Sequence, residues 1–95
     1  MTKSDEYRRK LETLINEWKM IIDQMEEKAK RTSALARSEL LEAVEILKIK
    51  RETVQERVNE MRHSGDETWE LLRKKAEAAI TEMKSALEQT IAKFK

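Results

Sequence analysis

Hydrophobic residues recur along the first two thirds of the chain at intervals of three, four and four, beginning with Leu11, Leu14 and Trp18. Each such set is followed by a similar one eleven residues later, as far as Leu47. An eleven-residue period gives about 3.67 residues per turn, so the apolar seam of one long helix runs nearly straight or slightly right-handed. After Leu47 the spacing shortens to the heptad of a coiled coil. The pattern predicts one continuous helix over residues 4–63. Its seam and interface residues are Leu11, Leu14, Trp18, Ile22, Met25, Ala36, Leu40 and Leu47.

A second helix is predicted over residues 66–94. It has the same three, four, four spacing, and Trp69, Ile80 and Ile91 lie eleven residues apart. The remaining apolar positions of this pattern are Leu72, Ala76, Met83, Leu87 and Phe94. Both helices therefore present one apolar stripe to a neighbour and a charged face to solvent, which is typical of helices that pack in bundles.

The stretch between the two helices contains Gly65, the only glycine, and the chain has no proline. Glycine disfavours a helix interior and is common just past a helix C-terminus. Ser64 and Glu67 have the spacing of a capping box, and Asp66 can cap the helix that follows. We expect Ser64, Gly65 and Asp66 to form the turn of an antiparallel helical hairpin, with Trp69 at its edge. The alternative is an uninterrupted helix that tolerates the glycine.

The segment 32–38 differs from its surroundings because it is rich in small residues. Small side chains let two helix backbones approach closely, so this segment is either a crossing point between helices or a weakly packed stretch.

Composition indicates one small all-α domain. Charged residues make up 41% of the 95 residues and aromatic residues 4%, a balance typical of coiled coils and long helices. The net charge is +1, with 14 basic and 13 acidic residues before Gly65 and 6 of each after it. This balance gives no electrostatic reason to bind nucleic acid. The chain has no cysteine, which excludes disulfides and thiolate metal sites.

No apolar run approaches the roughly 20 residues needed to span a membrane, and the first residues lack the apolar core of a signal peptide. We therefore expect a cytoplasmic location.

Helix lengths predict self-association. A helix of about 60 residues is about 90 Å long, whereas one of about 29 residues is about 43 Å long. Folded back about Gly65, the shorter helix would leave the segment from Leu11 to Met25 uncovered, although burying each large apolar side chain is worth about 1.5–3 kcal/mol. An antiparallel homodimer with a three-helix bundle at each end would cover it. The spacing does not distinguish a dimer from a tetramer.

Candidate chemistry is sparse. Glu60 and His63 have the spacing found in carboxylate-bridged di-iron bundles, but a single such motif at a helix end favours a role for His63 at the helix dipole. Trp18 and Trp69 are either seam residues or anchors for a partner. The sequence contains no nucleophile and base pair, glycine-rich phosphate loop or metal cluster, so we expect no catalytic, cofactor or metal site.

The sequence resembles a family of small bacterial coiled-coil proteins associated with stress responses. The resemblance rests on the segment 64–72, which is similar to the family's SGDxWE motif, and on the closing segment 91–94. It rests also on an opening that contains Tyr7, Leu11, Leu14, Trp18, Ile22 and Met25. The segment 32–38 departs from the charged, alanine-rich middle of the family. The resemblance implies a cytoplasmic helical protein with a loose link to stress and no enzymatic activity.

These patterns predict a non-enzymatic, self-associating coiled-coil protein that acts through protein–protein interaction. The alternative is a protein that binds lipid surfaces, because eleven-residue amphipathic repeats also occur in helices that lie on membranes. Such helices usually have a basic polar face, whereas here the polar face is mixed in sign.

Overall fold

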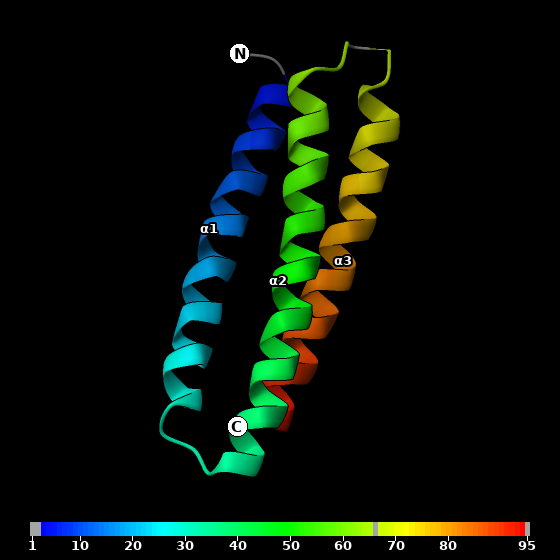
Figure 1. Ribbon diagram of the computed structural model, residues 1–95. Helices are drawn as coiled ribbons and strands as arrows, with labels where there is room; N and C mark the ends of the chain where they lie inside the picture. The colour runs from blue at the N-terminus through cyan, green and yellow to red at the C-terminus, as the bar shows by residue number, and fades with distance from the viewer. Residues whose placement is uncertain (1–2, 66, 95) are drawn as a thin grey trace.

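The computed structural model describes residues 3–65 and 67–94 and shows three helices packed side by side (Figure 1). They are α1 (Lys3–Ala29), α2 (Ala34–Arg62) and α3 (Trp69–Lys93), and the described residues contain no strand. The bundle measures 51 × 19 × 18 Å. The middle helix, α2, runs antiparallel to both neighbours and packs closely against each of them (Figure 1). The all-helical fold class predicted from the sequence is therefore confirmed.

The continuous helix predicted over residues 4–63 is wrong, because the chain turns back between Ala29 and Ala34. In this turn the backbone N–H groups of residues 30–32 donate to carbonyls three residues earlier, which tightens and ends α1. Ser33 then starts α2 as its N-cap, with an extended backbone and a side chain that accepts a hydrogen bond from the Ala36 N–H. The first two residues of the small-residue segment 32–38 thus lie in a connection between helices, and the rest form the start of α2.

The side chain of Arg37 holds this turn from the first turn of α2. Its Nε donates to the carbonyl of Ala29 at 3.2 Å, and its Nη2 donates to the carbonyl of Thr32 at 3.3 Å. The Thr32 hydroxyl also donates to the Ala29 carbonyl, at 3.0 Å. These bonds satisfy acceptors that every helix C-terminus leaves without an intrahelical partner. Polar side chains thereby replace the glycine or proline that usually marks a helix end.

The second connection joins α2 to α3 and contains Gly65. The Ser64 hydroxyl donates to the carbonyl of Met61, so it does not form the predicted capping box with Glu67. Thr68 occupies the N-cap position, and α3 starts at Trp69, three residues later than predicted. Gly65 does not adopt a positive φ, and a Cβ added there would meet no atom within 4 Å. The predicted turn residue Asp66 lies outside the described residues.

The core is shared by all three helices. Trp18 and Ile22 of α1 are 3% and 0% exposed, and Leu47 of α2 and Met83 of α3 are both 0% exposed. The segment predicted to need cover from a second chain is therefore covered by α2 and α3 of its own chain. The length argument for an antiparallel dimer fails, because its long helix is in fact two helices.

Two ion pairs join α1 to α2. Lys48 Nζ lies 3.2 Å from Glu26 Oε1, and Arg62 Nη2 lies 2.5 Å from Glu12 Oε1. Both pairs take a basic residue from α2 and an acidic residue from α1. Lys48 and Arg62 of α2 are thus directed towards α1.

Candidate functional site

Two hollows lie between α1 and α3, one at each end of the bundle, and a strip of surface between the two helices joins them. This strip is left open because α1 and α3 each pack closely on α2, whereas the backbones of α1 and α3 come close to one another at few points. Apolar side chains form its two walls, and all of them are partly buried except the exposed Ile91. The α1 wall contains Tyr7, Leu14, Ile21 and Met25, and the α3 wall contains Trp69, Ile80, Ile91 and Phe94. We call this feature the α1–α3 groove.

Helix periodicity places these residues in two lines. Tyr7, Leu14 and Ile21 follow one another at seven-residue intervals, which are two helical turns and therefore share one face. On α3, Trp69, Ile80 and Ile91 share a face at eleven-residue intervals. Ile91 is 42% exposed, so the groove is open to solvent.

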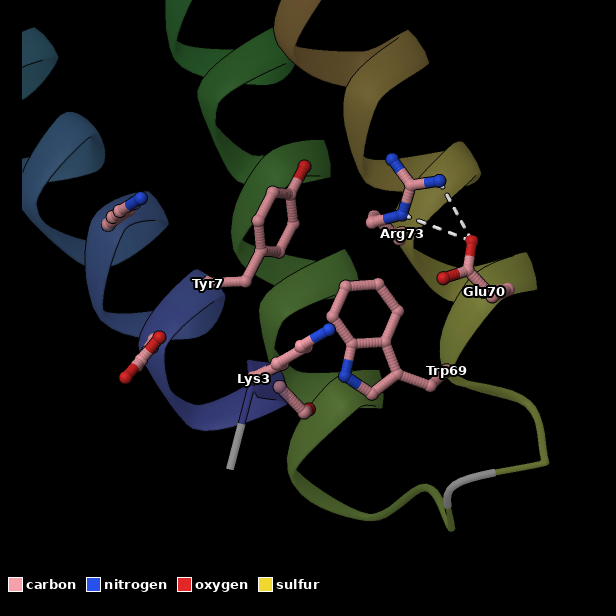
Figure 2. A pocket seen from close by; sticks show the side chains of 8 residues that line it. Lys3, Tyr7, Trp69, Glu70 and Arg73 are labelled. Carbon is pink, nitrogen blue, oxygen red and sulfur yellow. Dashed lines mark hydrogen bonds and ion pairs between the residues drawn. The ribbon is translucent and has the colours of Figure 1, made fainter. Parts of the chain in front are cut away.

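One end of the groove is aromatic. The rings of Tyr7 and Trp69 lie across the groove with their centroids 5.7 Å apart, tilted by 40° (Figure 2). Cζ of Arg73 lies 5.7 Å from the centroid of the Trp69 ring, within the range of a cation–π interaction. The hollow here has a volume of about 620 Å³. Its lining consists of Lys3, Ser4, Glu6, Tyr7, Lys10, Trp69, Glu70 and Arg73.

Ion pairs fix Arg73 at this end. Its Nη2 lies 2.8 Å from Glu70 Oε2 and its Nη1 lies 2.6 Å from Glu77 Oε1 (Figure 2 shows the Glu70 pair). The hydrogen bond to Glu70 raises the pKa of Arg73 further above its already high ordinary value. Arg73 therefore remains a cation beside the tryptophan.

Tyr7 is held in its neutral form. Burial raises the pKa of the Tyr7 hydroxyl above its ordinary value of 10.0, and the negative charge of Glu77 raises it further. The positive charge of Arg73 opposes this rise without cancelling it. At neutral pH the aromatic end thus presents an uncharged phenol, which can donate one hydrogen bond.

The other end of the groove is narrower and more apolar. Met25, Leu40, Thr90, Ile91 and Phe94 line a hollow of about 170 Å³ together with Lys28. The Lys28 ammonium donates to the carbonyl of Phe94 and so ties the end of α1 to the end of α3. The buried Thr90 hydroxyl donates to the Ala86 carbonyl at 2.8 Å, so its hydrogen-bonding need is met within α3.

Such a groove suits the apolar face of another helix. Its walls offer aromatic, aliphatic and thioether surface, with lysines at both ends and with Glu6 and Glu70 at the aromatic end. Helix-in-groove recognition uses anchors of this kind at regular helical intervals. Residues 3–65 and 67–94 contain no group of three or more His, Cys, Asp or Glu side chains that could hold a metal ion.

The predicted seam residues separate into two groups in the structure. Leu11, Trp18, Ile22, Leu40 and Leu47 are buried in the core of one chain. Leu14 and Met25 lie in the α1 wall of the groove, and Ala36 is partly exposed near the first turn. Of the predicted hairpin residues, Ser64 and Gly65 lie in the connection and Trp69 is the first residue of α3. His63 is the exposed C-cap residue of α2.

The pairing of Tyr7 with Trp69 and Arg73 was not found from the sequence. Tyr7 and Trp69 lie 62 positions apart, and they approach only because α1 folds back at residues 30–33. The eleven-residue repeat of Trp69, Ile80 and Ile91 was visible in the sequence, but it does not reveal which helix faces it.

Comparisons of the chain with protein-family models, with curated proteins and with solved structures find no match. The resemblance to bacterial coiled-coil stress proteins, and the stress-related role that it implies, thus stay predictions. Across the described part of the chain, every helix is too short or too polar to serve as a transmembrane segment.

Proposed function

We propose that this protein is a non-enzymatic, self-associating helical module that acts through protein–protein contacts made in the α1–α3 groove. The observation that supports this proposal is the open apolar groove, whose walls are exposed in part although the core beneath them is complete. Association that covers the groove would remove the surface of Trp69, Ile91 and Phe94 from water, and burial of apolar surface is the main favourable term in protein association. Aromatic and methionine side chains are enriched in the centres of such interfaces.

The structure offers a matched pair of substitutions on α3 to test this proposal. Ile91 lies in the groove and is 42% exposed, whereas Leu71 lies outside it and is 56% exposed. We expect Ile91→Glu to weaken self-association at least tenfold, because a carboxylate would have to be desolvated in the interface. Leu71→Glu should leave association unchanged. Light scattering over a concentration series gives the mass of each variant.

A wild-type chain that stays monomeric up to millimolar concentration would show that self-association is wrong. Equal association of both variants would instead show that the contact lies outside the groove. Circular dichroism establishes that each variant retains its helices.

Binding to a lipid surface is less well supported by the structure than self-association. The most apolar faces of the helices are turned into the core, so a helix could lie on a membrane only after the bundle opened. Flotation with anionic vesicles separates the two functions, since vesicle binding that dissociates the oligomer would favour the lipid function.

A further inference from the structure

The outward face of α2 carries five glutamates and one isoleucine in a line, which we call the acidic line. Members of this line follow one another at intervals of three or four residues and lie opposite the buried residues Leu40, Val44 and Leu47. The line contains no lysine or arginine, and all of its members are exposed. They are Glu42, Glu45, Ile49, Glu52, Glu56 and Glu60.

Large apolar side chains lie within and beside this line. Ile49 is 61% exposed, Ile46 is 52% exposed and Leu35 is 74% exposed. A single exposed aliphatic residue needs no explanation, but three on one side of one helix form a surface. We call the acidic line together with Ile46 and Leu35 the α2 outer face.

The acidity of this face follows from how α2 distributes its charges. Lys48 and Arg62 are paired with acidic residues of α1, and Arg37 binds carbonyl groups of the first turn. These three basic residues of α2 are therefore used in contacts away from the outer face. Among the described residues, Glu60 is the one glutamate of the line with an ion pair, to Arg57 at 2.7 Å.

The α1–α3 groove has the opposite character. Lys3 and Lys10 line its aromatic end from one edge of α1, and Lys28 lines its other end. Glu6 and Glu70 line the aromatic end as well, and Arg73 beside Trp69 is already paired with Glu70 and Glu77. The lysines still give the lining of the groove an excess of positive charge, whereas the α2 outer face combines apolar side chains with carboxylates.

The two surfaces also share an apolar interval, and the α2 outer face is long enough to cover the α1 wall. The α1 wall extends from Tyr7 to Met25, about 27 Å, and the α2 outer face from Leu35 to Glu60, about 38 Å, at about 1.5 Å per residue. Leu35 and Ile46 lie eleven residues apart, the same interval as Leu14 and Met25 in the groove wall. Apolar side chains that repeat at one interval can interdigitate along the whole contact.

We propose that the α1–α3 groove of one copy receives the α2 outer face of a second copy. This rests on the proposed self-association and names its geometry. Contact between two α2 outer faces would oppose glutamate with glutamate, and contact between two grooves would bring their lysine edges together. Contact between a groove and an α2 outer face instead places opposite charges together and covers Ile46 and Ile49.

The contact is heterologous, so it can continue from copy to copy. The groove opens on one side of α2 and the outer face lies on the opposite side, with α2 behind the groove in Figure 2. A pair of copies bound in this way therefore keeps one free groove and one free α2 outer face. Heterologous contacts of this type build rings or open chains of subunits.

Two variants, each lacking one surface, test this arrangement. The face variant carries Glu45→Lys, Ile49→Lys and Glu52→Lys, and the groove variant carries Lys3→Glu, Lys10→Glu and Ile91→Glu. All six positions are exposed, so the bundle should stay folded. We expect each variant alone to be monomeric at concentrations where the wild type associates. An equimolar mixture should reach twice the monomer mass of 11.3 kDa and grow no further.

The matched control changes an outer surface of α1 that lies outside the groove. Met20→Lys, Asp23→Lys and Glu27→Lys alter one apolar and two acidic exposed residues, as in the face variant, and this control should associate like the wild type. A milder variant, Glu45→Gln with Glu52→Gln, should weaken association by a smaller factor and serves if the face variant does not fold.

Three outcomes would overturn the inference. If the face variant associates as strongly as the wild type, another surface or an exchange of helices between copies makes the contact. A mixture that stays monomeric while the wild type associates would show that the two surfaces do not bind each other. A monomeric wild type would remove both the inference and the proposed function, whereas the first two outcomes leave self-association intact.

Discussion

Tyr7 is a residue whose ionisation is altered by the fold. It is the only tyrosine in the chain, so its ionisation can be followed by absorbance without interference from another phenol. Burial and the charge of Glu77 favour its neutral form. The folded protein thus holds the phenol proton more tightly than the unfolded chain does. This contribution to stability is present below about pH 10 and is lost as the pH rises through the pKa of the folded state.

We predict that Tyr7 of the folded protein ionises above pH 10 and that the midpoint returns towards 10 in denaturant. Glu77→Gln should move the midpoint down, because it removes a negative charge that opposes ionisation. Glu88→Gln, on the same helix but away from Tyr7, should have no effect. Ultraviolet titration measures each midpoint, and equal shifts in both variants would contradict this account.

At the scale of elements, the connection between α1 and α2 determines the architecture. The apolar spacing continues through it without a change of phase, since Ala29, Ser33, Ala36 and Leu40 keep intervals of four, three and four. Nothing in that spacing indicates an interruption. The chain nevertheless turns, because Ser33, Thr32 and Arg37 satisfy the backbone groups that a broken helix exposes and because folding back buries α1 on α2.

We predict that Arg37→Ala lowers the free energy of unfolding by about 1 kcal/mol, since two carbonyls lose a charged donor. Arg9→Ala is the control, because Arg9 is exposed on α1. This substitution should change the free energy of unfolding by less than about 0.5 kcal/mol. Urea denaturation measures both values. A loss for Arg37→Ala no larger than that for Arg9→Ala would show that the guanidinium does not stabilise the turn.

At the scale of the whole molecule, balanced composition hides an uneven distribution of charge. The net charge of +1 conceals an acidic outer face on α2 and a groove between α1 and α3 with lysines at its ends. The position of a residue around its helix is enough to separate inward-facing from outward-facing residues. The packing of α1 on α2, however, decides which basic residues form ion pairs within the molecule.

This distribution predicts that association of the wild-type chain weakens as salt is added. Screening reduces attraction between exposed charges, and the Debye length falls from about 10 Å at 0.1 M to about 3 Å at 1 M salt. Sedimentation at increasing sodium chloride concentration measures the effect. Association that strengthens steadily with salt would indicate a purely apolar contact, in conflict with the paired charges proposed here.

Much of the fold was accessible from the sequence. The apolar periodicity predicted helices throughout, because each helix must bury one stripe. It placed Leu11, Trp18, Ile22, Leu40 and Leu47 in a seam between helices, and the structure buries all five within one chain. The site was accessible in part. Leu14 and Met25 were recognised as apolar positions and Trp69 as part of a stripe, but their place in the walls of an open groove was not.

The sequence by itself therefore determined the helical class and which face of each helix is apolar, since both depend on residues close together in the chain. Only the tertiary structure decided that residues 30–33 form a turn, that α1 lies against α2 of the same chain, and that Tyr7 meets Trp69. The reason is physical. A periodic stripe requires a partner surface but does not specify which one, and the choice between a long helix and a folded pair depends on contacts between residues far apart in sequence.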